Sequence, residues 1–270
     1  MIEIRSCDGM DELQACVELQ IETWGYDESD VIPRKTFLVA QEIGGQVIGA
    51  FDTEIAPSPS LISAQSPTPA PGLVGFVFSL PGIKAGPAAP QPYLHSHMLA
   101  VKAAYRNRGL GRQLKLEQRR EALTRGIRRM QWTFDPLEIK NAFLNIHRLG
   151  AIVRSYRVDF YGVSSSRLQA GLPTDRLIAE WRLDSRRVEA HIAGRATSAQ
   201  AIEERIQVPA SIYQWKATEA GRQQALEVQL ENRKRFQQAF TQGLAVIGFS
   251  RDEQGNGIYE LGTDTQLELD

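Results

Sequence analysis

Cysteine and histidine are scarce in this chain of 270 residues, which has two cysteines and four histidines. Cys7 and Cys16 are too few for the disulfide framework of a small secreted domain, so a reducing, cytoplasmic setting fits them best. Two of the histidines form the pair His95 and His97, and the other two lie far from it in the sequence. Because a structural zinc site needs four converging ligands, we expect no metal site.

Long apolar runs are also missing. No stretch approaches the roughly 18 residues that a membrane-spanning helix requires. Residues 1–5 lack the basic start and apolar run of a signal peptide. We therefore expect a cytoplasmic protein with no membrane partner.

A large net charge is absent as well, since the formal net charge is −1. General nucleic-acid binding needs clustered positive charge, so we expect no nucleic-acid partner. The charge is nevertheless uneven, because residues 101–130 contain ten basic side chains and only two acidic ones. A basic segment in a neutral protein indicates one localised anionic ligand.

What the sequence does contain is a regular series of strand and helix patterns, with 42% hydrophobic and 23% charged residues, as in a globular protein. Expected strands cover 2–5, 46–52, 73–80, 93–101, 127–134, 151–161 and 175–183. Expected helices cover 13–24, 33–44, 110–125, 135–150, 185–194 and 217–240. A terminal hairpin is expected from 244–249 and 257–261. This mixture predicts an α/β fold, divided into a domain at 1–184 and a C-terminal subdomain at 185–270.

Two irregular stretches interrupt the strand patterns. Residues 56–72 contain five prolines, which forbid a regular ladder and predict a surface insertion between paired strands. Residues 81–92 are expected to form a second flexible stretch before the strand at 93–101.

The most informative segment is a strand, turn and helix at 93–125, centred on the glycines Gly109 and Gly111. Two glycines one residue apart let a backbone approach a ligand closely, and the helix after them points unpaired N–H groups into the turn. Such a turn binds phosphate oxygens. A P-loop is excluded because Arg112 and Gln113 follow the second glycine, and a Rossmann fingerprint lacks its third glycine. A tight turn with a solvated basic helix face is the simpler alternative.

The segment 101–111, which reads VKAAYRNRGLG, resembles the acetyl-CoA motif of the GNAT superfamily of N-acyltransferases. The family motif is Arg/Gln-x-x-Gly-x-Gly/Ala after a strand. The order of expected elements from residue 1 to about 183 is also similar to that of the family. The whole chain resembles a bacterial subgroup of these enzymes whose substrate is not established. The resemblance implies a central mixed β-sheet flanked by helices, here with a C-terminal α+β extension.

The resemblance also implies which residues contact acetyl-CoA or another acyl-CoA. The strand end would pair with the pantetheine arm, the turn would cradle the pyrophosphate, and the helix after residue 135 would make a second contact. The implied contacts are Leu99, Ala100, Val101, Arg106, Asn107, Arg108, Gly109, Leu110, Gly111, Arg112, Asn141 and Asn145. The chain departs from the family at two places. Ile146 stands where a tyrosine often protonates the thiolate, and Ile139 stands where an asparagine is often found.

His95 and His97 are the leading candidates for the catalytic base. Strand periodicity predicts that both share a face with Leu99 and Val101, with Ser96 on the other face. A member of the family uses a His-x-His at the same offset to take the proton from the substrate amine. Imidazole, with an unperturbed pKa near ~6.5, suits that transfer, and an acid limb between about 6 and 7 is expected. The alternative is that the pair only forms hydrogen bonds within a core.

His147, next to Ile146, is the candidate replacement for the missing tyrosine. The sequence thus predicts a CoA-dependent N-acyltransferase, acetylating or succinylating, that acts directly on a primary amine of a small molecule or amino acid. A CoA-binding module that has lost catalysis and acts as a sensor or structural partner is the alternative. A homodimer is a candidate assembly of the protein.

Overall fold

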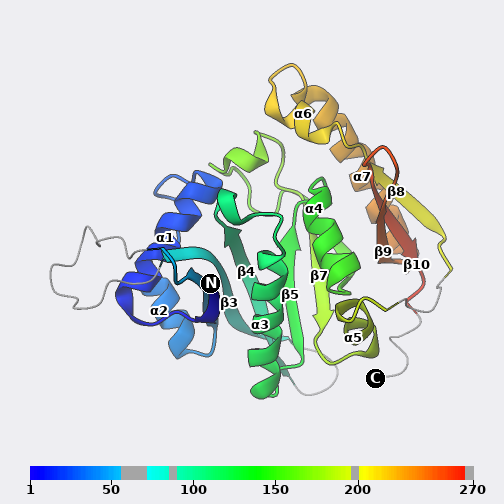
Figure 1. Cartoon of the computed structure of the whole chain (residues 1–270). Coiled ribbons are helices and arrows are strands. Elements are labelled where there is room, and N and C mark those ends of the chain that lie inside the picture. The colour runs from blue at the N-terminus through cyan, green and yellow to red at the C-terminus, as the bar shows by residue number, and fades with distance from the viewer. Residues whose placement is uncertain (56–71, 85–89, 196–200, 265–270) are drawn as a thin grey trace. The chain divides into compact units, whose positions relative to one another are not determined.

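The computed structural model describes residues 1–55, 72–84, 90–195 and 201–264. Figure 1 labels the helices and strands of the chain. The chain divides into two compact units. Unit 1 contains residues 1–130 and 165–167, and unit 2 contains residues 131–164 and 168–270.

Unit 1 is a four-stranded antiparallel arrangement in which each strand pairs with the next along the chain. Its strands are β1 (Ile2–Ser6), β2 (Gln46–Asp52), β3 (Gly72–Lys84) and β4 (Gln91–Val101). Its helices are α1 (Gly9–Trp24), α2 (Arg34–Glu42), the short 3-10 turn η1 (Ala103–Tyr105) and α3 (Leu110–Thr124). Strand β2 is buried along nearly all of its length and β3 from residue 73 to 79, whereas buried and partly buried residues alternate in β4 from residue 94 to 100.

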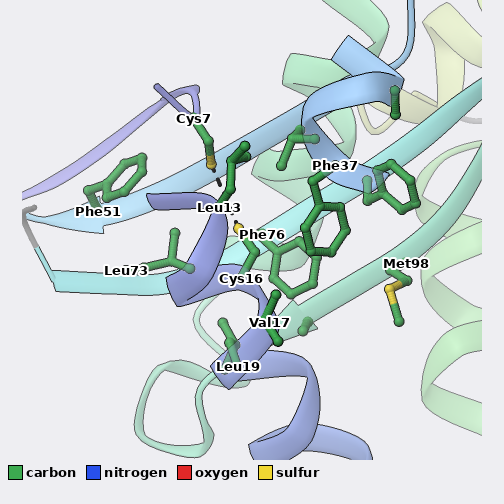
Figure 2. Close-up of a cluster of buried hydrophobic side chains, with 14 residues drawn as sticks. Cys7, Leu13, Cys16, Val17, Leu19, Phe37, Phe51, Leu73, Phe76 and Met98 are labelled. Carbon is green, nitrogen blue, oxygen red and sulfur yellow. Dashed lines mark hydrogen bonds between the residues drawn. The ribbon is translucent and has the colours of Figure 1, made fainter. Parts of the chain in front are cut away.

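Two apolar clusters occupy the two faces of these strands. On one face, side chains of α1 and α2 pack against the strands, and Figure 2 shows Phe37 of α2 beside Phe76 of β3. The sulfur atoms of Cys7 and Cys16 lie 3.8 Å apart in this cluster as buried free thiols. On the other face, Leu110 and Leu114 of α3 contact a separate cluster. Their spacing of four residues puts both on one side of the helix and fixes α3 against the strands.

Unit 2 contains the strand order β5–β7–β6–β9–β10–β8. The strands are β5 (Arg129–Phe134), which starts at the end of unit 1, β6 (Ile152–Arg157), β7 (Arg176–Arg182), β8 (Glu204–Val208), β9 (Ala245–Arg251) and β10 (Gly257–Gly262). The helices are α4 (Ile139–Ala142), the π-helical turn η2 (Phe143–Arg148), the 3-10 turn η3 (Arg167–Gln169), which also includes residues of unit 1, α5 (Arg186–Ile192), α6 (Ile212–Ala217) and α7 (Arg222–Thr241). The outer edge of β8 is covered by α7, because Asn232 and Arg235 donate hydrogen bonds to the carbonyl oxygens of Gln207 and Arg205. This protects an edge strand from pairing with other chains.

Most expected elements are present, and the predicted α/β fold is confirmed. The strand at 46–52 has the predicted bounds, Ser185 caps α5 by accepting a hydrogen bond from the Val188 N–H, and the terminal hairpin forms from β9 and β10. The proline-rich segment 56–72 lies almost entirely outside the described residues, apart from residue 72 in β3.

Four expectations about local structure are wrong. The stretch 81–92 is not irregular at its ends, because β3 continues to Lys84 and β4 begins at Gln91. The helix expected at 135–150 begins only at Ile139, because the Asp135 carboxylate accepts the N–H of Leu137 in a turn before it. The strand expected at 151–161 ends at 157, and the helix expected at 217–240 begins only at Arg222, as α7. Helix α6 and strand β8 were not expected.

The compact units do not follow the sequence division at 184. Their boundary falls between Met130 and Gln131, so residues 185–270 pack in the same unit as residues 131–164. The extent of the acyltransferase domain, 1–184, stays a prediction. No helix in the described ranges is long and apolar enough to cross a membrane.

Unit 2 contains a buried ion pair that we expect to be important for stability. Arg233 of α7 donates two hydrogen bonds to Asp175, at 2.8 and 3.0 Å, and the Asp175 side chain is fully buried. Arg233→Met leaves that carboxylate without its cation, which costs about 3–5 kcal/mol. Urea denaturation measures the loss. Arg235→Met on the same helix is the matched control, because its exposed pair with Glu204 is worth at most about 1 kcal/mol. Equal losses of unfolding free energy in the two variants would contradict the stabilising role of the buried Arg233–Asp175 pair.

Candidate functional site

The turn between β4 and α3 has a backbone that only certain residues adopt. Gly109 has φ = +80° and Asn107 has φ = +61°, both in the left-handed region. Glycine adopts that region freely, and asparagine tolerates it better than most residues. A Cβ added to Gly109 would meet no atom within 4 Å, so the space in front of the turn is open. The turn can therefore admit a ligand close to its backbone.

The N-terminus of α3 opens into this turn. Gly109 occupies the N-cap position, and within the described residues no side chain caps the helix there. The first N–H groups of a helix have no partner inside the helix and carry its positive dipole end. Leu110, buried in the cluster below, holds the helix start in place. The arrangement suits phosphate oxygens, as predicted from the two glycines.

The arginine in the first position of the motif folds back onto the strand. The Nε of Arg106 donates to the carbonyl oxygen of Val101, at 2.9 Å. Part of its role is therefore to brace the turn. The guanidinium of Arg108 lies 5.6 Å from the ring of Tyr105. Positive charge thus surrounds the turn on exposed side chains.

Tyr105 links the turn to the end of β2, a contact that the sequence did not reveal. Its hydroxyl donates to Asp52 at the end of β2, at 2.6 Å. That hydrogen bond, together with the terminal ammonium and the Glu54 N–H, lowers the pKa of Asp52. The two residues are 53 positions apart, so only the pairing of the strands brings them together.

A β-bulge in β4 changes which side chains share a face. Phe78 pairs with Met98 but Ser79 pairs with Ser96, so His97 is the extra residue. An extra residue reverses the alternation of side chains beyond it. The ring of His97 lies 6.1 Å from that of Phe78 and 5.8 Å from that of His95, on the α1 and α2 side.

The expected sharing of a face with Leu99 and Val101 is therefore wrong, because both of these contact the cluster under α3. Leu99, Ala100 and Val101 pair with Val77, Phe76 and Gly75 of β3.

Burial changes the acid–base properties of both histidines. Burial, followed by the charges of His97 and Lys115, lowers the pKa of His95 from 6.5 to about 4. Burial alone lowers the pKa of His97 from 6.5. Both imidazoles are therefore neutral at pH 7 and able to accept a proton. The acid limb expected between about 6 and 7 moves to lower pH.

The low pKa of His95 predicts an acid-dependent stability. Between about pH 6.5 and pH 4 the unfolded chain holds a proton at His95 that the folded chain lacks, so the free energy of unfolding falls as the pH falls. The slope for one such group is at most about 1.4 kcal/mol per pH unit. Urea unfolding of the wild type and His95→Gln at pH 4.5 and 7.5 measures it, and we expect a smaller difference in the variant. The same pH dependence in both proteins would contradict the shift.

A polar network lies under α3, on the other face of β4. Lys115 donates to the hydroxyl of Ser96 at 2.7 Å, and that hydroxyl donates to the Oε1 of Gln118 at 2.9 Å. Lys115 is only 3% exposed, so burial lowers its pKa well below the ordinary value. Lys115 was counted among the basic side chains of this helix that attract an anion. The structure instead buries it, because it lies on the helix face that contacts the strands.

The remaining predicted residues lie in unit 2, around η2. Asn141 is exposed, Asn145 is buried, and Ile146 is fully buried. Ile146 has no proton to donate. The exposed ring of His147 stacks on Phe143, with ring centroids 4.5 Å apart. A π-helical turn of this kind is rare and is frequent at functional sites. No group of three His, Cys, Asp or Glu side chains within the described ranges is arranged to hold a metal ion.

Residues 7–144 match the family model of the acetyltransferase (GNAT) family, which is just over half of the chain. The chain belongs to the GNAT acetyltransferase family. It is therefore an acyltransferase, and the mixed sheet flanked by helices is the GNAT fold. The match includes β4, the turn and α3, together with the start of η2.

Three solved acetyltransferase structures are similar to the chain, and the first of them, with a TM-score above 0.5, supports the same fold. Arabidopsis thaliana NAA60 in complex with acetyl-CoA is 15% identical with a TM-score of 0.51, covering 68% of this chain and 100% of that one. The Salmonella typhimurium putative acetyltransferase yncA with acetyl-CoA is 17% identical, with a TM-score of 0.49 and coverage of 68% and 95%. The ribosomal-protein-S18-alanine N-acetyltransferase from Escherichia coli is 14% identical, with a TM-score of 0.47 and coverage of 74% and 99%. No curated protein matches the chain.

Proposed function

We propose that this GNAT protein transfers an acyl group, most simply acetyl, from acyl-CoA directly to a primary amine of a small molecule or amino acid. The observation that carries the proposal is the uncapped N-terminus of α3 behind an open, left-handed Gly109, in a chain of this family. These features fit the pyrophosphate of CoA, which needs several N–H donors at close range.

The remaining CoA contacts follow from the strand that leads into the turn. We propose that an extended pantetheine arm lies along Leu99, Ala100 and Val101 at the end of β4, where these residues also pair with β3 and the Val101 carbonyl accepts the Nε of Arg106. At ~3.3 Å per residue, His97 lies roughly 13 Å along β4 from Val101. The strand therefore places the proposed phosphate site, in the turn, at a distance from the proposed reacting site, at His97. The pantetheine arm of CoA is long enough to span such a distance. In unit 2, Asn141 and Asn145 are the proposed second contact.

The bound thioester supplies an activated acyl group, and the protein must supply a neutral amine next to it. An amine is mostly protonated at pH 7, and a positioned base contributes about 10²–10⁴-fold by removing the proton. His97 is the better matched of the two histidines, because the pKa of His95 is lowered further, to about 4. His95 then acts beside it as a neutral neighbour. His147 remains the proposed proton donor to the CoA thiolate.

A covalent acyl-enzyme on cysteine does not fit this chain. Cys7 and Cys16 are 4% and 0% exposed, and burial raises the pKa of Cys16 well above its ordinary value. A buried thiol of high pKa is a poor nucleophile. Direct transfer between two bound substrates is therefore the proposed route.

A screen of amines against acetyl-CoA and succinyl-CoA, read by mass spectrometry, tests the proposal. We expect one class of small amine or amino acid to gain 42 Da or 100 Da (roughly the masses of an acetyl or succinyl group added at one N–H) in an enzyme-dependent manner, as a single transfer at one proximal amine requires. Acylation confined to protein or peptide amines would change the acceptor class. CoA binding without any transfer would favour the sensor alternative. Native mass spectrometry in the same experiments tests the proposed homodimer.

A further inference from the structure

The segment from Asp135 to Glu138 connects β5 to α4 and carries two carboxylates. Asp135 accepts the N–H of Leu137 at 2.8 Å, and α4 begins directly after Glu138. Asn141 and Asn145, the proposed second contact with CoA, follow within the next two turns. Any movement of this segment is therefore passed to those two side chains. Its charge also matters, because CoA carries several phosphates.

One lysine of the C-terminal region forms ion pairs with both carboxylates. The Nζ of Lys216, on α6, lies 3.1 Å from Asp135 and 2.9 Å from Glu138. The Lys216 side chain is 7% exposed, against 12% for Asp135 and 25% for Glu138. Burial lowers the pKa of Lys216, but the two carboxylates together raise it above its ordinary value. The lysine is therefore charged at neutral pH.

Other residues of the same region hold the segment in place. The buried Tyr259 donates its hydroxyl to the carbonyl oxygen of Pro136 at 2.8 Å. Gly257 lies so close to Ile139 that a Cβ there would be 3.0 Å from the isoleucine side chain. Tyr213 accepts the N–H of Lys140 at 3.4 Å. The C-terminal region thus contacts the segment and the start of α4 at several points.

We infer that the C-terminal region serves as a positioning element for acyl-CoA, and that Lys216 is its central residue. Lys216 fixes the start of α4 and offsets one of the two negative charges that would repel the phosphates of CoA. This inference rests on the proposed function, because it takes acyl-CoA as the ligand of α4. It assigns a role to residues beyond the segment that matches the family model.

Lys216→Met tests the inference in the full-length protein. We expect the Kd of CoA and the KM of acetyl-CoA to rise on the order of five- to tenfold. Repulsion between an uncompensated carboxylate and a phosphate has this size when solvent partly screens the two charges. The kcat at saturating acetyl-CoA should stay near the wild-type value. High KCl should reduce the difference in Kd, because salt screens repulsion. Lys216→Arg keeps the charge and should retain most of the affinity.

A charge-matched variant separates repulsion from packing. In Glu138→Gln/Lys216→Met one carboxylate remains, so the cluster keeps the net charge of −1 that it has in the wild type, and we expect CoA affinity to recover toward the wild type. Arg235→Met, which removes an ion pair elsewhere in unit 2, should leave the Kd unchanged. If Lys216→Met alone does not fold, the charge-matched variant still tests the inference. Its Kd for CoA must stay within about twofold of the wild-type value, which is less than the effect of one uncompensated charge.

The inference is overturned if Lys216→Met binds CoA like the wild type, or if both variants bind equally weakly without salt dependence. A wild-type protein that does not bind CoA would instead refute the proposed function.

Discussion

His95→Gln/His97→Gln is expected to lower the rate of amine acylation at pH 7 by about 10²–10⁴-fold, the usual contribution of a positioned base. The single variant His97→Gln should account for most of the loss, because the pKa of His95 is lowered further and leaves it a weak base. CoA affinity should change little, since the turn that binds phosphate lies further along the chain. Initial rates at subsaturating amine, with CoA titrations beside them, measure both quantities.

His191→Gln is the matched control for the histidine pair. Burial also lowers the pKa of His191, but its Nδ1 bonds to the carbonyl oxygen of His147 and it lies in unit 2. We expect its turnover to stay near that of the wild type. The rate of the double variant should also recover at alkaline pH, where the free amine is abundant, so pH 7 is the deciding condition. Wild-type turnover of a folded double variant at pH 7 would remove both histidines from the mechanism.

Gly109→Val is expected to weaken CoA binding by about 100-fold or more. A β-branched residue does not adopt φ = +80° without strain, so the turn must change its backbone and lose its aligned N–H donors. Two hydrogen bonds to a charged group are together worth roughly 3 kcal/mol or more. Calorimetric titration with CoA measures the affinity, and the loss of thermal protection by CoA gives an independent reading.

Gly126→Val is the matched control, because it places the same residue at the other end of the same helix. Gly126 has φ = +74°, and a Cβ there also meets no atom within 4 Å. The two variants therefore share the backbone strain, and only the first alters the proposed site. Equal CoA affinity in Gly109→Val and Gly126→Val would show that the phosphates bind elsewhere.

The sequence was sufficient for the features that depend on local chemistry. Period-two and period-3.6 apolar patterns predicted most strands and helices, and the glycine pair predicted the turn, in which Gly109 proves to be left-handed. These features depend on steric limits within a few adjacent residues, and the sequence gives the identities of those residues directly.

The features that the sequence did not predict depend on distant partners. The bulge at His97 exists because β4 pairs with β3 in a shifted register, and a strand pattern alone does not show where its partner slips. The sequence pattern indicates an exposed basic residue at Lys115, but in the fold this lysine is buried and bonds to Ser96, which in turn bonds to Gln118. The Asp135 segment resembles a helix start, but Lys216, 81 positions away, binds its carboxylates in a turn. Tertiary contacts override local preference in each case.

A single-turnover experiment with acetyl-CoA labelled in its acetyl group tests the central claim most directly. The protein is mixed in excess with labelled acetyl-CoA and the amine identified by the screen, and the reaction is stopped by acid at successive times. We expect the label to pass from CoA to the amine in one phase, with none attached to the protein, because transfer is direct. Two results would contradict this account. One is acetyl-CoA that binds to the protein but keeps its label, and the other is label that accumulates on the protein before it reaches the amine.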